Sequence, residues 1–168
     1  MIACSGTGQD GQIQAGGALA YVDNGDGTIN DLNTHLMWEK KSLDGSIHDQ
    51  STVYTWPDAF STFIGWPNAG GGFAGHTDWR LPNIKELQSI INYQNFDPAV
   101  SAAFNANCAL GCTVTTCSCT QSLFSYWSST AYQVGPNSAW VVFFFGGIVN
   151  AYDKSNFTAY VRAVRGGS

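Results

Sequence analysis

The chain has 168 residues, a length that suits one domain. Charged residues make up only 11% of it and the formal net charge is -5, so the sequence lacks the basic surface that a nucleic-acid partner requires. Its apolar runs are too short to span a membrane. We therefore expect one folded domain over residues 1–168, with residues 1–17 as an irregular lead-in, no nucleic-acid partner and no membrane span.

Two strands are expected near the N-terminus, over residues 18–22 and 28–38. The run DNGDG at residues 23–27 lies between them and favours a hairpin turn, because Asn and Gly readily adopt positive φ. The same run resembles a calcium loop, but glycines occupy two of the positions where oxygen ligands are needed. The turn is therefore the preferred interpretation.

Two helices are expected in the middle of the chain. A threonine cap followed by proline begins a helix over residues 55–64. Asn83 and Glu86 form a near capping box at the start of a second helix over residues 84–92. Further strands are predicted at the C-terminal end, over residues 126–130, 139–145, 148–152 and 160–164. Helices and strands segregated along the chain in this way predict an α+β fold.

Five cysteines are present, and four of them fall within a short Ser/Thr/Gly-rich stretch: Cys108, Cys112, Cys117 and Cys119. Their spacing lacks the paired C-x2-C elements of common structural zinc sites, so we favour two disulfides within this loop over a metal site. The pairing stays open at this point, and Cys4 is left over. Disulfides indicate an oxidising compartment.

Apolar residues occupy both faces of the strand predicted near residue 140. Successive side chains of a strand point to opposite faces, so Trp140 and Val142 cannot share a face with Val141, Phe143 and Phe145. We assign the first pair to the core and the other three to a face that a loop, a second subunit or a ligand must cover. The predicted core residues are Trp79, Leu81, Leu87, Trp127, Trp140 and Val142.

The sequence shows no catalytic constellation. The histidines are scattered, and we interpret all three as loop or surface residues: His35, His48 and His76. Three arginines lie among aromatic residues: Arg80, Arg162 and Arg165. We expect Arg80, and at least one of the other two, to tie strands and loops together. The sequence therefore predicts neither an enzyme nor a cofactor or metal site.

Four motifs agree with one family: GDGTINDLNTHLMW, DWRLPNIKELQSIIN, YWSSTAY, and AWVVFFFGG followed by YVRAVRGG. Together they resemble the bacterial domain family named after the C-terminal domain of the collagen-like adhesin Lcl. His35 departs from the family pattern, which usually has glycine there. The resemblance implies a C-type-lectin-like fold with two helices, a small twisted antiparallel sheet and long loops that present ligand contacts. The calcium-binding motifs of true C-type lectins are missing from this sequence, so the resemblance does not imply calcium-mediated sugar binding.

The resemblance also suggests where a ligand would bind. Within residues 141–159, some residues match the family pattern and form what we call the family frame. The pattern leaves the other positions free, and the loop over residues 132–137 adjoins them. The predicted ligand-binding residues are Val141, Phe143, Phe145, Ile148, Asn150, Tyr152, Asp153, Asn156, Phe157 and Tyr132. We expect a protein or glycan ligand on another cell or particle, with a homo-oligomer as a second way to cover the apolar face.

Some proteins of this fold are diversified by retroelements that mutate adenines in AAC codons to give NNC codons. Such codons never encode Lys, Glu, Gln, Met or Trp. From Val141 to Ala159, Lys154 is the only residue of those five types, and it belongs to the family frame. This composition favours diversification of the segment.

The predicted function is a non-enzymatic binding module of a surface or secreted protein, extracellular or at the cell surface, with a virion as the alternative. The alternative functions are an enzyme of the formylglycine-generating type, to which the fold is related, and a structural oligomerisation domain. The enzyme would need a reactive cysteine pair in a cleft near the C-terminal sheet.

Overall fold

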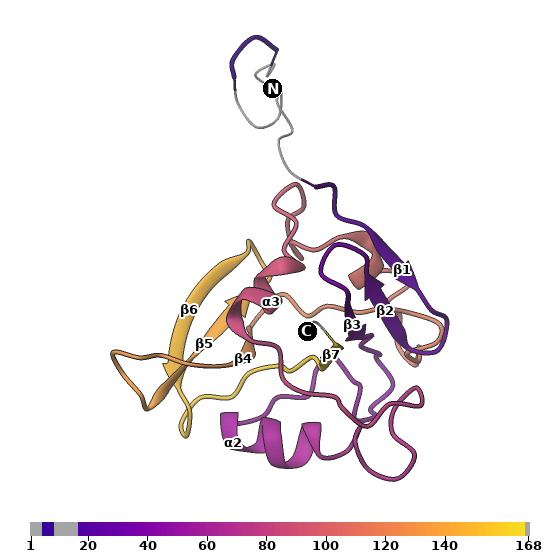
Figure 1. Ribbon diagram of the computed structural model, residues 1–168, viewed down its shortest axis with the longest axis vertical. Coiled ribbons are helices and arrows are strands. Elements are labelled where there is room, and N and C mark those ends of the chain that lie inside the picture. Colours follow the sequence, from indigo (N-terminus) through magenta and orange to yellow (C-terminus); the bar gives the residue numbers. More distant parts are fainter. Residues whose placement is uncertain (1–4, 9–16, 167–168) are drawn as a thin grey trace.

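The computed structural model describes residues 5–8 and 17–166, and it contains two small antiparallel sheets with short helices around them (Figure 1). The first sheet has the order β1–β2–β3–β7, formed by Tyr21–Asp23, Thr28–Asp31, Leu36–Glu39 and Val164–Gly166. The second has the order β4–β5–β6, formed by Ser125–Ala131, Ser138–Phe143 and Ile148–Asp153. The predicted α+β class is confirmed.

Both predicted helices are present. The first begins as α2 (Trp56–Asp58), capped by the Thr55 side chain, and continues as the π-helical segment η1 (Ala59–Ile64). The second is α3 (Ile84–Ser89), shorter than predicted, and its Asn83–Glu86 capping box is complete. A 3-10 turn, η2 (Ala102–Phe104), follows.

The strand predicted over residues 28–38 is wrong as a single element, because a turn divides it into β2 and β3. The Asp31 carboxylate accepts hydrogen bonds from the backbone N–H groups of Asn33 and Thr34 and so closes the turn. His35 then has a φ of 59°. This left-handed conformation costs glycine least, which explains why glycine is usual there in the family that the sequence resembles.

The predicted C-terminal strand also differs. The ladder of β7 begins only at Val164, and the preceding residues join the two sheets instead. Tyr160 forms an isolated bridge with Tyr126 of β4, and Val164 forms another with Arg80. The segment runs between the two sheets (yellow in Figure 1), so it packs against both.

Two hydrophobic clusters form the core and cover both faces of the β4–β5–β6 sheet. Tyr126 and Val142 belong to the first cluster, which extends to α3 and β3. Trp127 and Val141 belong to the second, which includes the crossing segment at residues 159–163. The predicted core residues Trp79, Leu81, Leu87, Trp127 and Val142 are all buried. The prediction that Trp140 is buried is wrong: it is partly exposed, belongs to neither core cluster, and packs edge to face against Tyr132 of the β4–β5 loop.

Several of the few charged side chains lie inside the protein. Glu39 is buried, 3.1 Å from Lys41 Nζ and 2.7 Å from His48 Nδ1, and it also accepts a hydrogen bond from Ala163 N. The buried guanidinium of Arg162 donates to the Glu39 carbonyl oxygen. His48 lies in a turn, as expected for a loop residue, but its side chain is buried rather than at the surface. Its ring lies between Glu39 and the aromatic rings of the 66–73 loop.

The prediction for the arginines is confirmed. Arg80 binds both carboxylate oxygens of Glu86 and the Gly166 carbonyl oxygen, while Arg165 pairs with Asp78. Each arginine thus joins the C-terminal segment or the second helix to another part of the chain.

The cysteine loop contains two disulfides, as predicted, and the pairs are Cys108–Cys119 and Cys112–Cys117. Cys4 lies outside the described residues.

Candidate functional site

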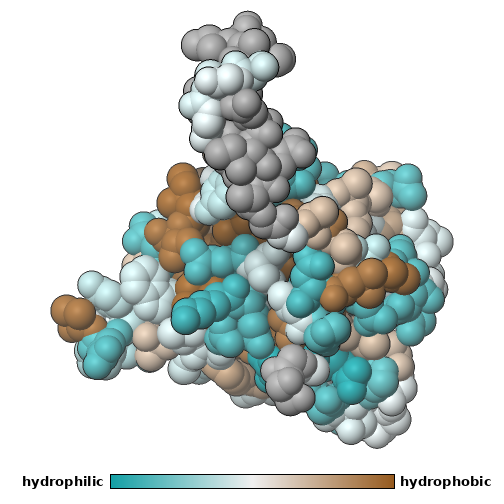
Figure 2. All heavy atoms as spheres, turned by 45° about the horizontal axis from the view of Figure 1, so that its top comes forward, coloured by the Kyte–Doolittle hydropathy of each residue, from teal (hydrophilic) through white to brown (hydrophobic). Residues whose placement is uncertain are grey.

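Exposed aromatic residues gather at the turn between β5 and β6. Tyr93 and Phe96 are 73% and 66% exposed, and Ile148, at the start of β6, is 54% exposed. Phe143 and Phe145 are partly exposed beside them. We call these five residues the aromatic edge. Hydrophobic side chains gather over the part of the surface that carries the β5–β6 hairpin (Figure 2).

Ring contacts connect the members of the aromatic edge. The Phe143 and Phe145 rings are stacked with centroids 5.9 Å apart, and Phe96 meets Phe145 edge to face at 4.4 Å. Phe143 pairs with Ile148 across the hairpin, so their side chains lie on the same face. These contacts hold Phe96, Phe143, Phe145 and Ile148 together as one surface.

The chain itself fixes the loop that carries Tyr93 and Phe96. Asp97 N donates to the Phe145 carbonyl oxygen at 3.1 Å, and the Tyr93 hydroxyl donates to the Gly147 carbonyl oxygen at 3.3 Å. Gly147 has a φ of 73°, and a Cβ there would lie 2.7 Å from the Tyr93 ring. Glycine therefore allows the turn to approach the loop this closely.

A third segment flanks the aromatic edge. Leu123 and Phe124 are exposed and directly precede Ser125, the β4 residue that pairs with Phe143. The Ser122 hydroxyl donates to the Asp97 carboxylate and so ties this segment to the 93–97 loop. Three segments that are far apart in the sequence thus present apolar side chains at one end of the sheet.

Only part of this surface is predictable from the sequence pattern. Phe143, Phe145 and Ile148 are among the predicted ligand-binding residues, whereas Tyr93 and Phe96 are not. The available signal was a pair of aromatic residues in the polar run NYQNFD at residues 92–97, where no strand or helix pattern requires them. Only the tertiary structure places that loop beside the hairpin turn.

Val141 was predicted to contact the ligand, and this is wrong because its side chain is fully buried. It belongs to the second core cluster, where the crossing segment contributes Ala159, Val161 and Ala163. At Val141, the crossing segment at residues 159–163 therefore covers this face of β5. Phe143, two residues further along the same face, is not fully covered.

The remaining predicted residues of β6 and the following loop lie toward the other end of the hairpin, since Asp153 pairs with Ser138 and Ile148 with Phe143. The Tyr152 and Phe157 rings are stacked with centroids 4.1 Å apart, and Phe157 also meets Trp127. Both rings therefore already contact aromatic side chains of the protein itself.

The polar candidates in this region also have partners within the chain. The Asp153 carboxylate accepts hydrogen bonds from the Ser155 hydroxyl and from the backbone of Ser155 and Asn156, which lower its pKa. The Asn150 side chain binds its neighbour's backbone N–H. Tyr132 packs against Trp140 on the β4–β5 loop. The structure therefore does not bring all the predicted residues into one site.

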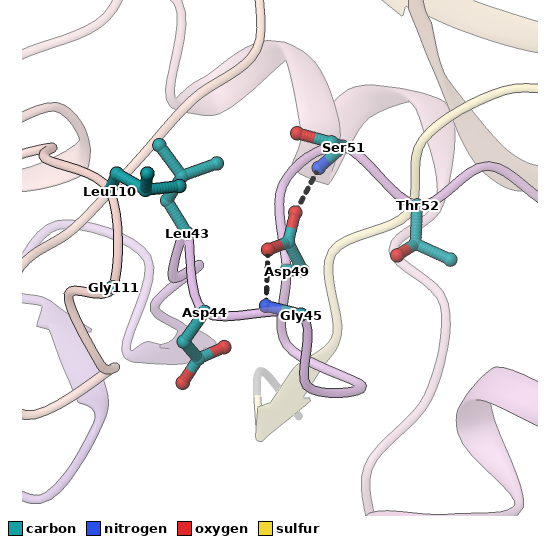
Figure 3. A pocket seen from close by; sticks show the side chains of 8 residues that line it. All are labelled: Leu43, Asp44, Gly45, Asp49, Ser51, Thr52, Leu110 and Gly111. Atoms are coloured by element: carbon teal, nitrogen blue, oxygen red, sulfur yellow. Dashed lines mark hydrogen bonds between the residues drawn. The ribbon is translucent and has the colours of Figure 1, made fainter.

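A hollow of about 400 Å³ lies between the 43–52 loop and the cysteine loop. Its walls are formed by Leu43, Asp44, Gly45, Asp49, Ser51, Thr52, Leu110 and Gly111. The Asp49 carboxylate accepts hydrogen bonds from the backbone N–H groups of Gly45 and Ser51, while Asp44 points away from it (Figure 3). Both carboxylates thus accept hydrogen bonds from within the 42–51 turn and hold it in place.

Within residues 5–8 and 17–166, one group of side chains has the composition and spacing of a metal site: Cys108, Cys112 and Cys119. All three are in disulfides. The same part of the chain contains no helix that is long and apolar enough to cross a membrane.

A comparison with family models matches residues 27–165 to the Lcl C-terminal domain. No curated protein matches the chain. The matched region contains both sheets except β1 and the last residue of β7, and it includes the aromatic edge and the cysteine loop. The chain therefore belongs to the Lcl C-terminal domain family, as its four motifs indicated.

Proposed function

We propose that this protein is a non-enzymatic binding module of an extracellular or cell-surface protein, and that the aromatic edge is its ligand-binding surface. The observation that carries this proposal is the high exposure of Tyr93, Phe96 and Ile148 around the Phe143–Phe145 stack. Leaving such groups in water does not stabilise the fold, so their gathering on one surface supports a binding role.

The chemistry of the aromatic edge favours a protein ligand over a glycan. Aromatic side chains offer large, rigid contact area and are enriched among the residues that dominate protein interfaces. A sugar would need several hydrogen-bonding groups beside the rings. The polar candidates Asn150 and Asp153 lie further along β6 and bind to the chain itself.

The pairing of the cysteines supports a binding module over an enzyme of the formylglycine-generating type. That enzyme would need a reactive thiol pair in a cleft near the C-terminal sheet. Here all four cysteines of the loop are joined to one another. The two disulfides are also compatible with an extracellular location.

The C-type-lectin-like fold and diversification by a retroelement remain part of this proposal. Burial narrows the positions that could vary, because Val141 and Ala159 are fully buried in the core. Of the free positions, Phe143, Phe145 and Ile148 contribute directly to the aromatic edge, and variation there would change the ligand.

The test is binding of the purified domain to an array of extracellular proteins and, in parallel, to a glycan array. We expect protein ligands whose affinity falls more than about fivefold when Phe96→Ser or Phe143→Ser is introduced, because an aromatic anchor contributes more than about 1 kcal/mol. Val134→Ser is the matched control. Val134 is also exposed and apolar, but it lies on the β4–β5 loop.

Equal binding by the parent and both phenylalanine variants would contradict the proposed surface. Binding to glycans alone would contradict the proposed ligand class. Melting temperatures of all variants must be measured in parallel, so that a loss of binding is not confused with a loss of folding.

A further inference from the structure

The outer strand β6 of the second sheet has one side open. β5 pairs with its inner side, and within the described residues no strand lies on its outer side (Figure 1). The other long outer strand, β4, is covered, because Tyr160 of the crossing segment forms a bridge with it. In the first sheet, Arg80 covers β7 through two backbone hydrogen bonds with Val164, and the outer strand β1 has only three residues. β6 is therefore the longest strand with an uncovered side.

The hydrogen-bond pattern shows which backbone groups of β6 point to the open side. The Lys154 N–H donates to the Asn137 carbonyl oxygen at 2.9 Å, so Lys154 faces the neighbouring strand β5. Bonded and non-bonded pairs alternate along an antiparallel ladder, so Val149 and Ala151 face outward. The Ala151 N–H agrees with this, because its acceptor is the Asn150 side chain at 2.8 Å and not the backbone of β5.

The unused backbone groups lie close to the aromatic edge. At the far end of β6, the Asp153 carbonyl oxygen accepts a hydrogen bond from the turn that follows. At the near end, the Gly147 carbonyl oxygen accepts one from the Tyr93 hydroxyl. Between these two, the N–H and carbonyl groups of Val149 and the carbonyl group of Ala151 have no hydrogen-bond partner among the described residues. They form a short row of donors and acceptors beside the aromatic edge.

The open side of β6 also lacks the usual protection of an outer strand. Natural proteins protect such strands with charged side chains, prolines, bulges or a covering segment. Residues 143–152 contain neither a charged residue nor a proline. The register of β6 on β5 is continuous, and the irregularity of this sheet lies between β4 and β5. β6 is therefore a regular strand that another strand can extend.

The chemistry of this row selects one kind of occupant. Donors and acceptors at the spacing of a β-strand are matched by the backbone of another extended polypeptide. Phe143 and Ile148 share one face of the hairpin, so a strand added to β6 would place every second side chain on that face. Because residues 93–96 and 143–152 are uncharged, the matching side chains are uncharged and apolar.

We propose that the protein ligand binds by strand addition: an extended segment of it pairs with the open side of β6 and lays apolar side chains on the aromatic edge. This inference rests on the proposed function and names the part of the ligand that is recognised. Backbone hydrogen bonds give affinity for any extended segment, and the aromatic edge gives preference among them. A change at Phe143 or Ile148 would then alter the preferred side chain and leave the backbone pairing intact.

The experiment uses random linear peptides of 12 residues, displayed on phage and selected on the immobilised full chain. The best binder is synthesised and N-methylated at one position at a time, which removes one backbone N–H. We expect affinity to fall more than about tenfold at every second position within the bound segment, and less than about threefold at the positions between. Affinity should change less than about threefold between 0.05 and 0.5 M salt, because the surface is uncharged.

A pair of protein variants tests the same contact from the other side. Val149→Pro removes the outward N–H without removing a hydrogen bond to β5, a place where an outer strand accepts proline. Val149→Ala is the matched control, because it shortens the side chain and keeps the N–H. We expect Val149→Pro to bind the peptide at least about tenfold more weakly than Val149→Ala. Should the proline variant fail to fold, the N-methylated peptides decide the question.

Three results would overturn the proposal. One is an N-methylation series without a two-residue period, and another is equal binding by folded Val149→Pro and Val149→Ala. The third is a dimer of the chain that Val149→Pro dissociates, since a second copy would then occupy β6. Phe143→Ser separates this inference from the proposed function. If Phe143→Ser weakens binding while the series lacks the period, the aromatic edge stands and strand addition fails; with the period present and Phe143→Ser silent, the reverse holds.

Discussion

Two regions of the protein reverse the usual distribution of side chains: the cluster around Glu39 places charged groups inside, and the aromatic edge places large apolar groups at the surface. Glu39 and Lys41 lie inside, whereas Tyr93, Phe96 and Ile148 lie at the surface. The difference is in their partners. Inside, Glu39 and Lys41 bind each other, but the rings at the edge have large faces open to solvent. The fold therefore explains the buried charges, whereas no contact within the described residues explains the exposed side chains at the edge, which is why we propose them as a binding surface.

The largest effect is expected from removing the charge of Glu39. Glu39→Gln leaves Lys41 buried without its counter-ion and should lower the free energy of unfolding by about 3–5 kcal/mol. Chemical denaturation monitored by tryptophan fluorescence measures this change. A loss below about 1 kcal/mol would show that the buried cluster contributes no more than a surface ion pair.

A smaller effect marks the boundary between the core and the aromatic edge. Val141→Ala should cost about 2 kcal/mol, because it opens a cavity beneath the crossing segment. Phe143→Ala, two residues along the same face, should cost less than about 1 kcal/mol, as substitutions outside the core usually do. If the order of the two losses were reversed, Phe143 would belong to the core and the aromatic edge would lose a central member.

The smallest effect is expected on acidification. Burial alone raises the pKa of Glu39, but Lys41, His48 and the Ala163 N–H outweigh it and hold the pKa below its usual value. The folded state thus releases this proton more readily than the unfolded state. The stability from Glu39 is present above its unfolded pKa of about 4.3 and is lost as pH falls through the lower folded value.

Thermal unfolding from neutral pH to about pH 3, compared with Glu39→Gln, isolates this contribution. The difference in stability between the two proteins should shrink on acidification. A constant difference would mean that the carboxyl group does not titrate in this range.

Local sequence signals determined much of this protein. The side chains of Asn83 and Glu86 each accept a hydrogen bond from the other residue's backbone N–H. The DNGDG run supplies the turn between β1 and β2, so both elements follow from contacts within a few residues. The clustered cysteines likewise indicated disulfides, because so few residues separate them that their pairing does not depend on the rest of the fold. The family could be named from four motifs, and the match over residues 27–165 confirms it.

The tertiary structure decided what lies above each face of the C-terminal sheet. Alternation along β5 separates Val141 from Val142, but it cannot say that residues 159–163 return to cover Val141 and leave Phe143 partly open. The alternation also does not predict that the 92–97 loop places Tyr93 and Phe96 beside Phe143, or that His48 is buried next to Glu39. These contacts join residues far apart in the chain, and periodicity reports only which face a side chain occupies, not what packs against that face.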